Sequence, residues 1–153
     1  MSNREKAAWA SLLTTAAIWG YYFVKLGLAL SAGEADVGAF IGLFARCVVA
    51  SIVVAIVVAA VFASRGQDLD APGDERDRQI ELRATRAAYA LLSAGALLAS
   101  LSTPFVTRFA GRIFDGDPSS GVALVVGNLV LAAVLLSELV RSGGQILLYR
   151  TGR

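Results

Sequence analysis

The stretch CVVASIVVAIVVAAVFAS at positions 47–64 holds eighteen consecutive residues without a charge. In water, so many valines and isoleucines would suit a buried strand. An isolated strand in lipid would leave its backbone groups unsatisfied, whereas a helix satisfies them within the segment. Eighteen residues are also close to the roughly 20 that cross the hydrocarbon core of a bilayer. The stretch therefore predicts a transmembrane helix.

Three more charge-free windows of similar length occur in the chain, at residues 7–24, 87–107 and 118–137. Of the 153 residues, 56% are hydrophobic and 17% are charged, whereas roughly a quarter are charged in soluble domains. This composition excludes an ordinary soluble enzyme, a nucleic-acid-binding domain and a disordered protein. We predict an all-α fold in which one domain, residues 1–153, forms a bundle of four transmembrane helices at about 7–30, 40–63, 87–106 and 119–140.

Positive charges are distributed unevenly around the predicted spans. Ten lie in the N-terminal segment, the connection between the second and third spans, and the C-terminal segment. Only Arg108 and Arg112 lie on the opposite side, between the third and fourth spans. Because the richer side is cytoplasmic, both termini are predicted to be cytoplasmic. The first window is longer than a signal-peptide core and has Lys25 near its end, so we expect it to be retained as a span.

The residues before the third window predict a cytoplasmic helix over 74–86. Asp74 is a suitable N-cap, and nothing after it breaks a helix, so the helix should continue into the third span as one rod. This rod would project two to three turns from the membrane. Pro104 should end or kink it. Apolar residues at every fourth position over 105–114 predict an outer interfacial segment. The tail 145–150 is too short to cross, so it should extend the fourth span or lie on the inner surface.

Two cations inside the predicted spans, Lys25 and Arg46, lie at similar depth near the outer side. They can face a shared anion, either a lipid phosphate or the carboxylates of Glu34 and Asp36. The simpler interpretation, which we favour, is that both side chains extend to the outer headgroups.

Further candidate residues lie in the second and fourth spans. Asn128 is near the middle of the fourth span and can hydrogen-bond across the bundle. Glu138 precedes Arg141 by three residues, which predicts an ion pair on one helix face. Gly38 and Gly42 form a GxxxG pattern, which is typical of close helix packing and permits a homodimer.

The charged segment 74–86 and the C-terminal tail carry the candidate contact residues. Pairs such as Asp74 with Arg78 or Glu75 with Arg78 can stabilise the helix, which is the simpler interpretation. The alternative is a docking face for a cytoplasmic partner or another copy of the chain, since the two signs are too balanced for a patch that binds anionic lipid. The candidate partner-contact residues are Asp74, Glu75, Arg76, Asp77, Arg78, Glu81, Arg83, Arg86, Tyr149 and Arg150.

Groups suited to catalysis or cofactor binding are few. The chain has no histidine and one cysteine, Cys47, which argues against a disulfide within the chain, the usual zinc sites and haem ligation. No two carboxylates share a membrane depth, and no glycine-rich phosphate loop is present. The net charge of +2 does not favour nucleic acid. We expect a non-enzymatic protein without metal or cofactor, whose partners are membrane lipids and either another membrane protein or a second copy.

Two motifs, DERDRQIELR at 74–83 and ELVRSGGQILLYRTG at 138–152, resemble those of a family of small four-helix prokaryotic integral membrane proteins of unknown function. The chain departs from the family pattern at Thr151, where the family carries a second arginine. The resemblance implies the topology given above and a bacterial inner membrane. The family carries no known activity, so the resemblance implies no catalytic residue.

Two functions fit these observations. The first is a protein that acts through protein contacts, as a small scaffold, accessory subunit or regulator. The second is a subunit of a small oligomeric transporter or channel. Small multidrug exporters also have four short spans, but they rely on a carboxylate in the first span, where Lys25 is the only charge here.

Overall fold

The computed structural model describes residues 3–32, 36–64, 74–113 and 118–151, and nearly all of them are helical. The helices are α1 (Asn3–Ala32), α2 (Val37–Ser64), α3 (Glu75–Ile113) and α4 (Pro118–Thr151). Each helix is long and apolar enough to cross a membrane. The prediction of an all-α fold with four membrane-spanning helices is therefore confirmed.

The helices are longer than the predicted spans, and two of the expected continuations are present. Helix α3 runs without interruption from the charged segment into the third span, and α4 includes the tail as far as Thr151. The start of α3 has the expected N-cap, because the backbone N–H of Asp77 donates to a carboxylate oxygen of Asp74 at 2.7 Å.

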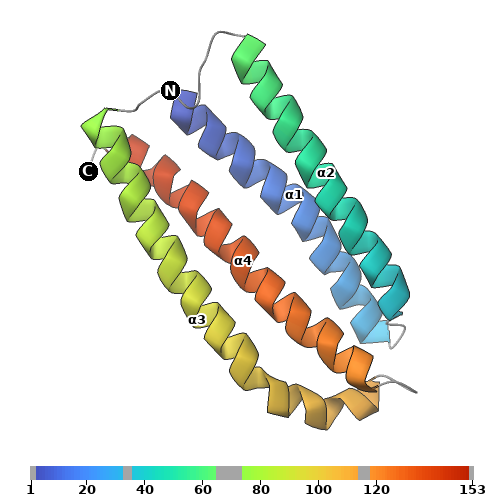
Figure 1. The fold of residues 1–153 in the computed structure, drawn as a ribbon. Helices are drawn as coiled ribbons and strands as arrows, with labels where there is room; N and C mark the ends of the chain where they lie inside the picture. Colours follow the sequence, from blue (N-terminus) through green and yellow to red (C-terminus); the bar gives the residue numbers. More distant parts are fainter. Residues whose placement is uncertain (1–2, 33–35, 65–73, 114–117, 152–153) are drawn as a thin grey trace.

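Pro104 does not end α3, since the helix continues to Ile113 with the proline inside it. Proline lacks the backbone N–H that would bond one turn back, and its ring crowds the carbonyl there, so a bend is the expected result. The last part of α3 indeed turns away from the axis of its first part and crosses the end of the bundle (Figure 1). This turned part includes residues 105–113 of the segment that we predicted to be interfacial.

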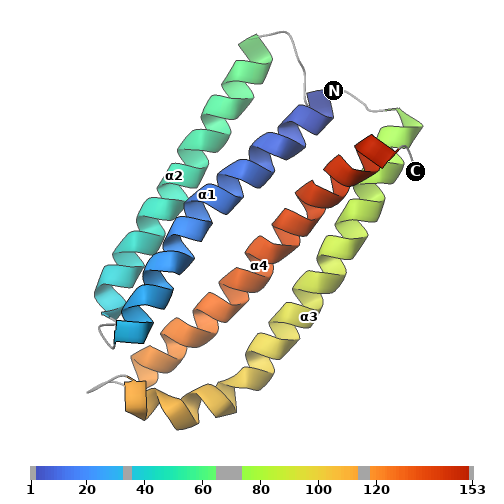
Figure 2. The ribbon, with the colours of Figure 1, turned by 180° about the vertical axis from the view of Figure 1, so that it is seen from behind.

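The four helices lie side by side in the order α2, α1, α4, α3 (Figures 1 and 2). Helix α4 packs on both α3 and α1, whereas α2 packs mainly on α1. The first residues of α1 and α3 and the last residues of α2 and α4 lie at one end, which we call the terminal end. The other end, where α1 ends and α2 begins, is the hairpin end.

The contact between α3 and α4 is built from small residues. A Cβ atom placed on Gly95 would lie 2.5 Å from the Cβ of Ala133, so the two backbones approach as closely as a glycine allows. Closer to the terminal end, a Cβ on Gly144 would lie 3.6 Å from the Cβ of Ala84. The buried residues of α3 that recur along this contact are Ile80, Ala84, Ala88 and Ala99.

The contact between α1 and α2 is built from aromatic residues near the hairpin end. Tyr22 is 2% exposed and packs with Leu26, Phe40 and Cys47. Its ring packs edge-on with that of Phe44 of α2, with centroids 6.3 Å apart. Phe40 and Cys47 are the buried residues of α2, so burial in this helix is confined to its first half.

Candidate functional site

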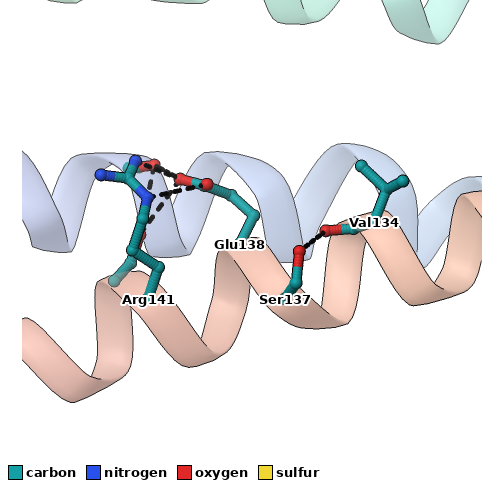
Figure 3. Close-up of polar contacts among 6 residues, drawn as sticks. Val134, Ser137, Glu138 and Arg141 are labelled. Carbon is teal, nitrogen blue, oxygen red and sulfur yellow. Dashed lines mark hydrogen bonds and ion pairs between the residues drawn. The ribbon is translucent and has the colours of Figure 1, made fainter. Parts of the chain in front are cut away.

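A cluster of polar side chains joins α1 and α4 near the terminal end (Figure 3). The Arg141 guanidinium donates to both carboxylate oxygens of Glu138, at 3.0 Å from Nε and 2.6 Å from Nη2. The Ser11 hydroxyl of α1 donates to the same carboxylate at 3.1 Å. Ser142, which is 1% exposed, completes the cluster with contacts of 3.4 Å to Ser11 and Glu138. The predicted ion pair is therefore present, and it also links two helices.

A polar pocket of about 260 Å³ adjoins this cluster between α1, α3 and α4. Helix α4 contributes Arg141, Ser142, Gln145 and Tyr149, while α3 contributes Glu81. Glu81 also attracts the Arg141 guanidinium electrostatically. Two of the predicted contact residues, Glu81 and Tyr149, thus line this pocket, and Glu81 is also exposed.

Arg150, another predicted contact residue, is held by α1. Its Nε lies 3.3 Å from a carboxylate oxygen of Glu5, which is buried. The guanidinium also stacks over the ring of Trp9, with 5.4 Å from its carbon to the ring centroid. These contacts fix the last turn of α4 to the first turns of α1.

The ion pairs that we predicted within the charged segment do not form. The Asp74 carboxylate accepts the capping bond, and Glu75 accepts a hydrogen bond from Gln79 at 3.4 Å. Arg78 is exposed and forms no ion pair with any residue in the described ranges. A capping carboxylate is held near the backbone N–H groups, which explains why Asp74 does not reach Arg78.

Two of the four acidic residues of the charged segment lie on the side of α3 that packs on α4. Asp77 is half-buried on the side of Ile80 that faces α4, and Glu81 lines the polar pocket on that side, whereas Asp74 and Glu75 are exposed. Three arginines share another side of the helix, because residues spaced by seven and three positions share a helix face. They are Arg76, Arg83 and Arg86, and we call them the arginine stripe. All three are exposed, and none forms an ion pair with a residue that the structure describes.

Lys25 and Arg46 are exposed, and they do not meet at a shared partner among the described residues. The Lys25 ammonium lies 5.9 Å from the centroid of the Tyr21 ring, one turn toward the terminal end. The Arg46 Nε donates to the Gly42 carbonyl at 3.2 Å, one turn toward the hairpin end. That both side chains extend to the outer headgroups stays a prediction. Glu34 lies outside the described residues.

Asn128 bonds within its own helix through its donor group. Its Nδ2 donates to the Leu124 carbonyl at 2.8 Å, while its Oδ1 is buried and accepts no hydrogen bond within the described part of the chain. Tyr22 of α1 interacts with it across the bundle. Both residues line an apolar groove of about 600 Å³ between α2 and α4.

No atom of another described helix lies within 4 Å of a Cβ placed on Gly38 or Gly42. The nearest atoms to a Cβ on Gly38 and on Gly42 belong to the side chains of Asp36 and Arg46. The packing role of this GxxxG pattern therefore stays a prediction about contacts with another chain. The close approach within the chain occurs instead at Gly95 and Gly144.

Sequence reasoning missed Ser11 and Ser142, which complete the polar cluster. The available signal was spacing, because Ser142 lies four residues after Glu138 and so shares its helix face. Nothing in the sequence pairs Ser11 with α4, since that pairing depends on the order of helices in the bundle. Within the described ranges, no group of three or more His, Cys, Asp and Glu side chains could hold a metal ion.

Comparison of the chain with protein-family models, with curated proteins and with solved structures finds no match.

Proposed function

We propose that this multi-pass membrane protein acts through contacts with other proteins, as a small scaffold, accessory subunit or regulator, and that it is not an enzyme. The observation that carries the proposal is the arginine stripe on one side of α3. Its three arginines are exposed and have no ion pair among the described residues, while Asp77 and Glu81 lie on the side toward α4. Exposed arginines that share one helix side and lack a carboxylate partner suit an acidic protein surface.

The geometry favours a protein over the lipid surface as the occupant of the stripe. The stripe runs along the helix axis, and Arg76 lies ten residues from Arg86, which is about 15 Å. Since α3 is a membrane-spanning rod, only the arginines nearest the bilayer can reach the headgroups. A protein surface beside the rod can contact all three.

The test compares two sets of charge reversals in protein reconstituted in nanodiscs of neutral lipid. We expect an acidic peptide of glutamates to bind the wild type in low salt, and the triple variant Arg76→Glu, Arg83→Glu, Arg86→Glu to lose this binding. Arg78→Glu is the matched control, because Arg78 is equally exposed on another face of the same helix. Pull-down in mild detergent should then show the same pattern for the natural partner. Equal loss in the control and the triple variant would refute the stripe as the docking face.

The proposal also covers location and orientation. We propose a bacterial inner membrane with both termini in the cytoplasm, supported by the ten positive charges in the two terminal segments and in the connection between the second and third spans, against two between the third and fourth spans. The resemblance to the prokaryotic four-helix family supports the same placement.

A transporter or channel subunit is the second candidate, and the polar pocket between α1, α3 and α4 is the observation that favours it. A pocket with charged and hydroxyl groups beside apolar spans is where a polar solute would bind. A flux assay in liposomes tests this. Flux that falls in Arg141→Ala, or in the Lys25→Ala and Arg46→Ala variants, would favour transport over a contact role.

A further inference from the structure

Two layers of ionic residues lie closer together than a bilayer core is thick. The hydrogen bond from Ser11 places Glu138 and its partner Arg141 at the level of Ser11 on α1. Lys25 lies fourteen residues further along α1, which is about 21 Å. Because the hydrocarbon core is about 30 Å thick, at least one of these layers lies within it in a bilayer of ordinary thickness.

Arg46 lies closer still to the Glu138 layer. Phe44, two residues before it, contacts the rings of Trp19 and Tyr22, with centroids 5.7 and 6.3 Å away. Since α2 runs antiparallel to α1, Arg46 lies near the level of Trp19, about 12 Å from the level of Ser11. Nine residues of α2, or about 13 Å, separate its first residue from Arg46. The Arg46 backbone therefore lies well inside the span, about midway between the charged layer and the start of α2.

The arginine faces away from the rest of the chain. The side of α2 that packs on α1 carries Phe40 and Cys47, which are buried, whereas Arg46 is exposed. Its side chain lies along Gly42, where the missing Cβ leaves room for it, and its Nε is satisfied by the Gly42 carbonyl. That bond leaves the charge itself unneutralised, and no residue in the described ranges forms an ion pair with it. A cation inside a span costs up to about 2.5–3.5 kcal/mol on insertion scales, the upper values applying at the helix centre, and it usually faces a protein partner.

A second copy of this chain does not supply the missing charge. The carboxylate inside α4, Glu138, is held by two nitrogens of Arg141, Nε and Nη2, and lies at a different depth. In a parallel pair of copies, each Arg46 would meet membrane segments that carry no carboxylate at its level, since residues 7–24, 87–107 and 118–137 are free of charge.

We propose that the face of α2 around Arg46 docks a transmembrane helix of another protein, and that this helix carries an Asp or Glu at the depth of Arg46. Charge complementarity selects this occupant, because a carboxylate is the group that neutralises a guanidinium with two parallel hydrogen bonds. The proposal is independent of the arginine stripe, which lies on α3 near the terminal end.

The experiment uses the full chain, labelled with a fluorescent donor, in vesicles of neutral lipid with a hydrocarbon core of ordinary thickness. The probes are three acceptor-labelled transmembrane peptides of leucine and alanine that carry one Asp, one Asn or no polar residue at the centre. We expect energy transfer to the Asp peptide with an affinity roughly tenfold above that of the apolar peptide, and an intermediate value for Asn. Arg46→Leu should abolish the preference, and Arg46→Lys should retain part of it. Lys25→Leu is the matched control and should keep it.

Three outcomes would overturn the proposal. The first is equal transfer to the Asp and apolar peptides. The second is transfer between labelled copies of the protein that depends on Arg46 without any peptide, which would make a second copy the occupant. The third is loss of the Asp preference when anionic lipid is added, which would assign Arg46 to lipid phosphates. Since Arg46 is exposed, Leu or Lys fits there without repacking, and the protein should keep its helical content in all variants.

Discussion

The contact of α3 with α4 and the contact of α2 with α1 are built from different kinds of residues. Helix α3 lies on α4 along small residues, with Gly95 close against Ala133 and Gly144 close against Ala84. Helix α2 lies on α1 through large rings near the hairpin end, with Tyr22 and Phe44 at the centre. Toward the terminal end, α1 and α2 leave a groove of about 320 Å³ between them.

This difference matters because lipid is as apolar as the side chains. Helices in a membrane associate through packing and interhelical hydrogen bonds, so a contact is as strong as its fit is close. The small-residue contact keeps the backbones of α3 and α4 close along much of both helices. The aromatic contact holds only the first half of α2 against α1. We infer that α2 is the helix most free to exchange its neighbours, which agrees with the docking face that we propose around Arg46.

The largest effect is expected where backbones are closest, at Gly95. A leucine there would force its side chain into Ala133 and push α3 away from α4, so we expect Gly95→Leu to lower the free energy of unfolding by about 3 kcal/mol. SDS titration of the protein in mixed micelles measures this. Gly20→Leu is the matched control, because no atom of the described chain lies within 4 Å of a Cβ at Gly20. Similar losses for the two variants would mean that α3 and α4 do not depend on close approach.

The second effect is expected in the aromatic contact. Removal of the buried Tyr22 ring should cost about 2 kcal/mol, less than in a water-soluble core because lipid replaces part of the lost packing. The same titration on Tyr22→Ala measures it. Tyr21→Ala removes an equal ring that is 55% exposed, and it should change the free energy of unfolding by less than about 0.5 kcal/mol. An equal cost at both positions would show that the aromatic cluster does not hold α1 to α2.

The sequence predicts where each helix lies along the chain better than it predicts which helices pack against each other. Charge-free windows locate all four spans, and Asp74 as an N-cap and Glu138 with Arg141 as an ion pair follow from spacing along one helix. The close contact at Gly95 does not follow from spacing along one helix. Its partner Ala133 is 38 residues away, and any of several small residues could have packed against it. Gly38 and Gly42 have the better-known spacing, yet no atom of another described helix lies within 4 Å of a Cβ placed on either of them.

The same holds for the candidate site: spacing predicts which residues share a face of one helix, but not which face packs against another helix. Spacing could show that Arg76, Arg83 and Arg86 share a helix face, but not that Asp77 and Glu81 face α4. That fact depends on which side of α3 packs against α4.

The third effect on stability is expected at the polar cluster that links α1 to α4. Glu138→Gln leaves the Arg141 guanidinium without a carboxylate and weakens the bond from Ser11, so we expect a loss of about 1 kcal/mol in the free energy of unfolding. Replacing Glu138 and Arg141 together, each by Gln, should recover part of this loss because no unpaired charge remains. Additive losses in the double variant would show that the pair contributes no coupling energy.

The smallest effect, and one of opposite sign, is expected at Asn128. Polar residues inside spans usually stabilise a bundle, and sequence reasoning assigns that role to this one. In the structure its Nδ2 bonds within α4, and its buried Oδ1 accepts no hydrogen bond from the described residues, so the amide is only half satisfied. Leu has nearly the same volume and removes the unsatisfied carbonyl, so Asn128→Leu should stabilise the protein by up to about 1 kcal/mol. SDS titration should therefore move the unfolding midpoint upward. A clear downward shift would mean that the interaction with Tyr22 outweighs the unsatisfied oxygen, and that the groove between α2 and α4 is held by a polar contact.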